Sequence, residues 1–341
     1  MARRSAELAL DRTLMAYDAE LENLAEQLPA PSFQSAPDFM RGVPPPSPAV
    51  VDGLLVRGGL YTIAARPKTG KSILLLNLAI AIATGCNWLG RRVERGRVLM
   101  FLLEDSPRTI KQRLEAMCPS GAPEDLLIHA ETFRLAEENY DATVKACRGA
   151  ALVIVDPVIQ ASEVKDWNSQ QEVRDTFDLW RRLARETEAC QALSYHHRKM
   201  PGDFGDAMAG SVQAQATVDG ILELYRDRKL QTIERKVTFI GRDWPDLQDE
   251  VVALDTETLI WQPKGTYAEA KQDARDAERE QRAVSVADIL PEQGPGVSRK
   301  DIQEKTGLSE RTVRETLEDL GDSLQQSGQG VSGDPYRFWK Q

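Results

Sequence analysis

The stretch YTIAARPKTGKSILLLNLAIAIA, residues 61–83, decides the fold. It begins with a short apolar run, passes through a turn-rich segment and continues as an almost unbroken apolar helix. Strand, loop and helix in this order are the context in which a phosphate-binding loop is found. The loop ARPKTGKS, residues 65–72, fits the pattern G-x-x-x-x-G-K-[ST] except at its first position, where Ala65 replaces glycine.

This loop predicts a set of contacts with ATP and Mg²⁺. Its backbone N–H groups would point at the β-phosphate, at the positive end of the following helix, and Gly70 would permit close approach. We expect Lys71 to reach the β- and γ-phosphates and the Ser72 hydroxyl to bind Mg²⁺. We expect position 65 not to require positive φ, which alanine resists. The predicted nucleotide-binding residues are Ala65, Arg66, Pro67, Lys68, Thr69, Gly70, Lys71, Ser72 and Ile73.

Two further apolar runs end in carboxylates. RVLMFLL, residues 97–103, precedes Glu104, and ALVIV, residues 151–155, precedes Asp156. Carboxylates at the carboxyl ends of buried parallel strands face the ligand crevice. We therefore expect Glu104 to orient or deprotonate the attacking water, and Asp156 to hold Mg²⁺ through water as a Walker B residue.

The next predicted strand, residues 190–195, ends in two histidines. His196 and His197 could sense the γ-phosphate or simply cap the strand, and metal binding is not expected because adjacent strand residues point to opposite faces. The following loop begins with Arg198 and Lys199 and contains several glycines. It could follow a phosphodiester backbone or be a mobile surface loop. A strand at residues 220–225 and a hairpin at residues 229–242 would complete this core.

The C-terminal part has the pattern of a winged helix-turn-helix. A charged, alanine-rich segment at residues 266–282 predicts a solvated helical linker. Helices are then predicted at residues 284–290, 298–306 and 309–320, followed by a two-stranded wing at residues 325–339. Arg311 and Arg314 could meet bases and phosphates if the last of these helices enters a major groove. Acidic residues outnumber basic ones in this part, so duplex DNA and a replication protein stay equal alternatives as its partner.

Composition narrows the class of protein. The chain has 341 residues and a formal net charge of -10, which argues against coating nucleic acid through bulk charge. No apolar run is long enough for a membrane span and the start lacks a signal-peptide core, so we expect a cytoplasmic protein with no membrane partner. The scattered cysteines indicate neither a zinc site nor a disulfide framework. They are Cys86, Cys118, Cys147 and Cys190.

The sequence divides into five predicted parts. Residues 1–30 read as an amphipathic helix, whose leucine spacing fits either a short heptad seam or a helix packed on its own domain. Residues 31–50 are rich in proline and predict an extended linker. The α/β core follows at residues 51–265, the helical linker at residues 266–283 and the winged helix at residues 284–341.

Four segments together resemble the AAA_25 group of RecA-type ATPases, which includes the RepA-type hexameric replicative helicases of plasmids. They are, in order, GGLYTIAARPKTGKS, VLMFLLEDSPRTIKQRLEAM, ALVIVDP and LSYHHRK. The resemblance covers about residues 54–263. Its most specific part is Glu104-Asp105-x-Pro followed by a helix with Arg113.

The resemblance implies an α/β fold with a RecA-like P-loop core and a parallel-rich central sheet. The N-terminal helix and the winged-helix domain would be additions. It further implies a homo-oligomeric ring, expected to be a hexamer, with ATP between subunits and single-stranded DNA in the channel. The function implied is that of an ATP-hydrolysing DNA motor, a replicative helicase of a plasmid, phage or other mobile element. The alternatives are a recombinase-like ATP switch and a DNA-binding regulator that does not unwind.

The resemblance also assigns roles to residues. Lys71 and Ser72 would bind nucleotide and Mg²⁺, Glu104 would be the catalytic carboxylate and Asp156 the Walker B acid, with His196 or His197 as sensor. The chain departs from RepA-like members at the arginine finger, because Leu222 stands where they have arginine. The preferred substitute is Arg242, and Arg235 is the second choice.

Overall fold

The computed structural model describes residues 33–43, 47–167, 169–196, 217–241, 244, 247–331 and 335–341. The chain forms two units, Met1–Pro46 and Ser47–Gln341. In the first unit, α2 (Ala36–Gly42) begins at Ser35, whose hydroxyl accepts a hydrogen bond from the Asp38 amide. The extended linker predicted for residues 31–50 is therefore wrong at α2, because a serine cap starts a helix there. The helix predicted within residues 1–30 lies outside the described residues.

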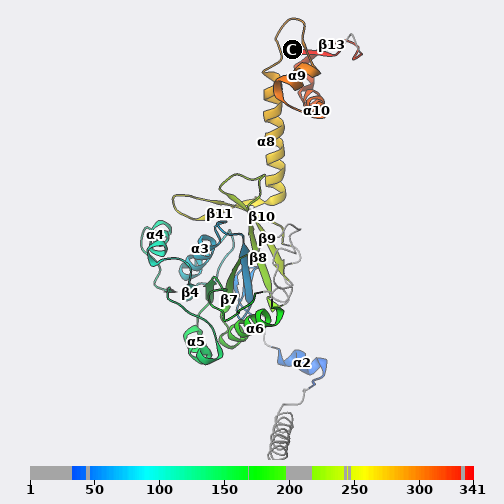
Figure 1. Ribbon diagram of the computed structural model, residues 1–341. Coiled ribbons are helices and arrows are strands. Elements are labelled where there is room, and N and C mark those ends of the chain that lie inside the picture. The colour runs from blue at the N-terminus through cyan, green and yellow to red at the C-terminus, as the bar shows by residue number, and fades with distance from the viewer. Residues whose placement is uncertain are drawn as a thin grey trace, which may run out of the picture. The chain divides into compact units, whose positions relative to one another are not determined.

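In the described part of the second unit, a nine-stranded sheet has the order β11-β10-β9-β8-β3-β7-β6-β4-β5 (Figure 1). The strands from β8 to β5 in this order are parallel, whereas β9, β10 and β11 extend the sheet antiparallel. This architecture confirms the predicted RecA-like α/β fold with a parallel-rich sheet. The strands are β3 (Leu60–Ala65), β4 (Val98–Leu102), β5 (Leu126–His129), β6 (Leu152–Asp156), β7 (Cys190–His196), β8 (Gly220–Tyr225), β9 (Glu234–Gly241), β10 (Glu250–Leu254) and β11 (Trp261–Thr266). A separate small sheet pairs β1 (Ala49–Val51) with β2 (Leu55–Val56).

Helices cover both faces of the large sheet. The apolar residues of α3 (Lys71–Thr84) and α4 (Pro107–Met117) belong to one buried cluster, and those of α5 (Tyr140–Cys147) and α6 (Gln170–Thr187) to another. Strands β3 and β6 are buried along their whole length, as expected of parallel strands covered on both faces. The sheet thus holds the start of α3 rigidly at its carboxyl edge.

The antiparallel extension corrects the predicted hairpin at residues 229–242. Strand β9 is one continuous strand that lies between β8 and β10 and pairs antiparallel with both, with Leu222 of β8 opposite Phe239. The connecting residues 226–233 form the turn. Three consecutive charged residues, Glu234, Arg235 and Lys236, begin β9 without apolar–polar alternation, so the sequence alone left the partners of β9 open.

The C-terminal part corrects a second boundary. Helix α8 (Tyr267–Ala287) is continuous, so the predicted linker and the first predicted helix of the last domain are one helix. Its Val286 is buried with Ile302, Val313 and Phe338 in a separate small core. A capping box at Thr266 starts α8. The helix contains no glycine or proline, so nothing in its sequence ends it before Ala287.

The remaining elements follow the predicted order. Helix α9 (Arg299–Thr306) starts at the Ser298 cap, and α10 (Glu310–Leu320) at the Ser309 cap. Strands β12 (Val297–Ser298), β13 (Leu324–Ser327) and β14 (Arg337–Lys340) form a three-stranded sheet. The assignment of these elements as a winged-helix domain stays a prediction. In the described parts of the chain, every helix is too short or too polar to cross a membrane.

Candidate functional site

The phosphate-binding loop joins β3 to α3. Ala65 ends β3 in regular parallel pairing with His196 and Leu224, so position 65 requires no glycine. Gly70 has φ +105° and is the N-cap of α3, a conformation that favours glycine. The Thr69 hydroxyl donates a hydrogen bond to the Arg66 carbonyl over 2.7 Å and closes the turn. The loop therefore leaves the N-terminal amides of α3 available to a phosphate.

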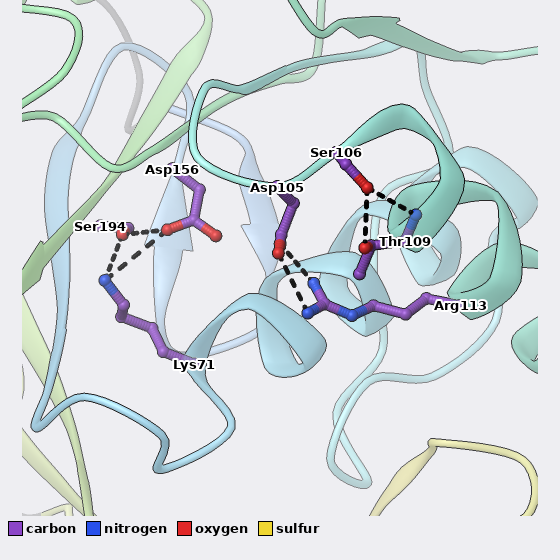
Figure 2. A network of polar contacts seen from close by, with 7 residues as sticks. All are labelled: Lys71, Asp105, Ser106, Thr109, Arg113, Asp156 and Ser194. Carbon is purple, nitrogen blue, oxygen red and sulfur yellow. Dashed lines mark hydrogen bonds and ion pairs between the residues drawn. The ribbon is translucent and has the colours of Figure 1, made fainter.

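Behind the loop, three buried side chains from three elements meet (Figure 2). Lys71 of α3 donates a hydrogen bond to the Ser194 hydroxyl of β7, and Ser194 donates one to Asp156 of β6. The Lys71 Nζ lies 3.6 Å from Asp156 Oδ1. The structure thus brings the two predicted residues together and adds Ser194, which the sequence analysis missed.

Ser194 left one signal in the sequence. It is a fully buried hydroxyl in the strand CQALSYH, where Cys190 and Ala192, the preceding residues on the same face, are apolar. A buried polar group needs a hydrogen-bond partner, so a lone serine in an apolar strand indicates a polar neighbour across the sheet. The pattern does not say which neighbour.

The environment of Lys71 disfavours an isolated positive charge. Burial lowers the pKa of Lys71, while the charges of Asp156 and Glu104 and the hydrogen bonding with Asp156 act in the opposite direction. The ammonium is therefore held by carboxylates in a region largely excluded from water. An anionic ligand at the loop would provide a stronger partner for it.

The adjacent carboxylates after β4 have different environments. Asp105 forms an ion pair with Arg113 of α4, with Nη2 lying 3.2 Å from Oδ1. Ser106 caps the same helix by accepting a hydrogen bond from the Thr109 amide over 3.2 Å. Figure 2 shows this group beside the Lys71 cluster. Glu104 is exposed and acts electrostatically on Lys71, which is compatible with its predicted role toward water.

The two predicted metal ligands suit a hard cation. Ser72 is in the first turn of α3, and Asp156 ends β6 at the same edge of the sheet. A hydroxyl and a carboxylate are oxygen ligands of the kind that Mg²⁺ prefers, with phosphate and water completing its shell. The donor set therefore fits a magnesium–nucleotide complex.

Basic residues line a hollow of about 570 Å³ on the outer side of the loop. Arg66 and Lys68 come from the loop, and Arg226 and Arg228 follow β8. The Tyr267 hydroxyl donates a hydrogen bond to the carboxylate of the nearby Asp227. The sequence alone did not indicate that these basic residues lie beside the loop.

The other predicted site residues are placed as follows. Arg235 in β9 donates to the Thr69 carbonyl of its own chain over 3.0 Å. Arg311 and Arg314 are exposed on α10, each in an ion pair one turn along the same helix. The backbone of His196 ends β7, while its side chain and the residues His197, Arg198, Lys199 and Arg242 lie outside the description. Their predicted roles stay predictions.

Comparison with known proteins agrees with this arrangement. A DnaB-like replicative helicase, whose structure describes its interactions with primase, is 16% identical over 72% of this chain and 70% of its own, with a TM-score of 0.52. A solved ATPase domain is 16% identical over 60% of this chain and 84% of its own, with a TM-score of 0.49. A KaiC-like protein from Pyrococcus horikoshii OT3 is 12% identical over 63% and 93%, with a TM-score of 0.44.

A comparison with curated proteins finds no match. The family model AAA_25, described as an AAA domain, matches residues 25–203, which is more than half of the chain. Its match includes the phosphate-binding loop, the strands before Glu104 and Asp156, and β7. The chain therefore belongs to the AAA_25 family of AAA domains, with the RecA-like fold.

Proposed function

We propose that this chain hydrolyses ATP and uses the energy as a DNA motor. The observation that carries the proposal is the buried contact of Lys71 with Ser194 and Asp156 directly behind the phosphate-binding loop. A buried lysine aimed at that edge, together with free amides at the start of α3, is suited to binding a polyphosphate. Family membership supports the same activity.

Each residue then has a chemical task. Lys71 would turn from Asp156 toward the β- and γ-phosphates, where its charge is needed as negative charge develops on the transferred group. Ser72 and Asp156 would hold Mg²⁺, which neutralises phosphate charge when bound. Glu104 would orient the attacking water and accept its proton, as its exposed position at the end of β4 allows.

The finer proposal is a ring of identical subunits that encloses single-stranded DNA. The shared fold with a DnaB-like replicative helicase supports it, as does family membership. In such a ring, ATP lies between subunits, and the neighbour supplies an arginine to the γ-phosphate. We propose that the protein is a replicative helicase of a plasmid, phage or other mobile element, and that Arg242 is the residue offered to the neighbour.

Two substitutions test the ATPase proposal. Lys71→Ala should weaken ATP binding about 10- to 100-fold, since it removes a charge-assisted contact made in the ground state. Glu104→Gln should leave affinity nearly unchanged and reduce turnover by about 10²- to 10⁴-fold, since its carboxylate acts only during attack. Binding of a fluorescent ATP analogue and phosphate release measure the two effects. Lys111→Ala, an exposed residue of α4, is the matched control.

The outcome also separates the motor from its alternatives. Equal loss of ATP affinity in both variants would contradict the assignment of Glu104. Stimulation of phosphate release by single-stranded DNA, together with unwinding of a forked duplex, is expected of the helicase. Stimulation by duplex DNA without unwinding would instead support a DNA-bound switch or regulator.

A further inference from the structure

The back of the phosphate-binding loop is covered by Arg235 from the antiparallel extension. Its Nε–H donates to the Thr69 carbonyl over 3.0 Å. Its Nη1 donates to the carbonyls of Thr232 over 2.8 Å and Glu234 over 2.6 Å. Three carbonyl contacts fix the plane of the guanidinium, because its donors have a rigid geometry. Arg235 therefore ties the loop to β9 and the turn before it.

Trp261, the first residue of β11, covers the next position of the loop. A Cβ atom added to Gly70 would lie 2.6 Å from Cζ2 of its indole ring. The ring is 3% exposed, and the Arg235 guanidinium carbon lies 5.8 Å from the ring centroid. Arginine and tryptophan thus contact each other as well as the loop, in an arrangement suited to a cation–π interaction.

A third residue connects Trp261 to the helix that follows the loop. The Trp261 amide donates to Asn77 Oδ1 over 2.7 Å, and Asn77 Nδ2 donates to the Leu259 carbonyl over 3.1 Å. Asn77 is in the second turn of α3 and is largely buried. The loop and α3 are therefore both fastened to β11 and the turn before it.

These contacts act on the side of the loop opposite its phosphate-binding amides. A phosphate-binding loop functions only if its N–H groups point inward, so its carbonyls must point outward and find other partners. Arg235 provides a charged donor to one of them, the Thr69 carbonyl, and the Trp261 ring fills the space next to Gly70. The contacts favour one loop shape before nucleotide arrives, which reduces the ordering cost of binding.

We propose that Arg235 and Trp261 are positioning residues that hold the phosphate-binding loop of their own subunit in its nucleotide-binding shape. We call the two side chains the loop clamp. Arg235 then acts within one subunit, rather than as an arginine finger offered to a neighbour. The turnover readout below rests on the proposed ATPase function, whereas the affinity readout requires only nucleotide binding.

The first experiment measures affinity for a fluorescent ATP analogue. We expect Arg235→Ala to weaken binding about 10-fold, since a charged hydrogen bond that fixes the loop is lost. Arg235→Lys should recover part of the loss, because lysine keeps the charge without the planar fork. Arg92→Ala, an exposed arginine paired with Asp52 away from the loop, should change nothing.

Trp261→Phe supplies a spectroscopic readout that general destabilisation would not reproduce. Since the indole lies against Gly70, nucleotide binding should change the fluorescence of Trp261, and Trp261→Phe should remove that part of the change. Trp88→Phe, a buried tryptophan that does not contact Gly70, should retain it. An identical fluorescence change in wild type and Trp261→Phe would overturn the coupling between the Trp261 ring and the nucleotide-bound loop that the clamp requires.

Mixing subunits separates the loop clamp from a finger. If Arg235 and Glu104 serve the same subunit's site, mixing Arg235→Ala with Glu104→Gln leaves no complete site and should give no turnover beyond the sum of the two variants measured separately. If Arg235 serves the neighbour's site, mixed interfaces regain turnover. Unchanged affinity in Arg235→Ala together with restored turnover would overturn the proposal. Should the ATPase proposal itself fail, turnover would be absent in the wild type as well, while the affinity measurements still decide on the clamp.

Discussion

The parallel and antiparallel halves of the large sheet contribute to the site in different ways. The parallel strands β3, β6 and β7 place Lys71, Asp156 and Ser194 at one edge, where they contact each other. The antiparallel strands β9 and β11 place Arg235 and Trp261 behind the loop, where they contact its backbone and Gly70. The parallel half therefore provides the chemical groups, and the antiparallel half supports the shape of the loop.

Apart from the variants described above, we expect the largest effect on turnover from a substitution in the parallel half of the sheet, at Ser194. Ser194→Ala removes a hydroxyl that bonds both Lys71 and Asp156, and leaves these buried charges without a mediating group. We expect turnover to fall about 10-fold while ATP affinity falls less, because the orientation of Asp156 matters most when phosphate charge develops. Steady-state phosphate release and analogue binding measure the two quantities.

Ser162→Ala is the matched control for this variant. Ser162 is also buried, and its hydroxyl donates to the Val158 carbonyl over 2.6 Å without contacting the loop. It should lose some stability but keep its turnover. If both serine variants lose turnover equally, the effect is one of folding, and the parallel half has no special polar cluster at Ser194.

The site residues whose places could be predicted from the sequence lie in the parallel half of the sheet, although Ser194 of that half was missed. The places of Asp156 and Glu104 were predictable because a parallel strand that ends in a polar residue fixes that residue at a known edge, and that of Lys71 because the loop motif fixes it at the start of a helix. Arg235 and Trp261 were not, because their contacts depend on which strands pair and in what register. Glu234 and Lys236, the neighbours of Arg235 in β9, are also charged, so the sequence does not fix which face of the sheet Arg235 occupies.

Boundaries were predicted less well than elements. The predicted helix starts at residues 298 and 309 follow from local sequence, and the structure has Ser298 and Ser309 as the N-caps of α9 and α10. The end of the charged linker was misplaced because α8 changes from exposed to buried without any break in its helical backbone. Composition detects such a change in burial, but it does not detect continuity of the hydrogen-bonded helix.

An intermediate effect, on stability rather than turnover, is expected in the antiparallel half at Glu223 of β8. Burial raises the pKa of Glu223 to about 7, with Lys236 acting to lower it and Asp249 to raise it. The unfolded chain loses this proton near pH 4.3, so folding binds a proton between about pH 4 and 7. The free energy of unfolding should therefore fall as pH rises through this window, by roughly 2–3 kcal/mol in total.

Glu223→Gln should remove this dependence, since glutamine keeps the shape without the charge. At pH 8 the variant should unfold with a free energy about 2 kcal/mol higher than that of the wild type, and near pH 4 the two should converge. Urea unfolding at several pH values measures this, with the exposed Glu257→Gln as control. An unchanged pH slope, or a large loss of turnover, would contradict a purely structural role for this position.

The smallest effect is expected from the C-terminal part. Arg311 and Arg314 form ion pairs with Glu315 and Glu318 on the same helix, so phosphates would have to compete with these carboxylates. Such exposed pairs are individually weak, and the competition reduces rather than abolishes attraction to DNA. Duplex DNA and a protein partner both remain compatible with this surface.

Deleting residues 283–341 should therefore leave ATP turnover within about twofold of the full chain, because the truncation spares the loop, its clamp and the strands that hold them. This deletion removes Val286 together with the other residues of the small C-terminal core, so no part of that core is left exposed on the truncated chain. Phosphate release with and without single-stranded DNA measures the result, and binding of duplex DNA by each chain shows what the deleted part contributes. If the truncated chain neither assembles nor hydrolyses ATP, the C-terminal part supports the site as directly as the antiparallel strands do, and the division between chemical and supporting regions must extend beyond the sheet.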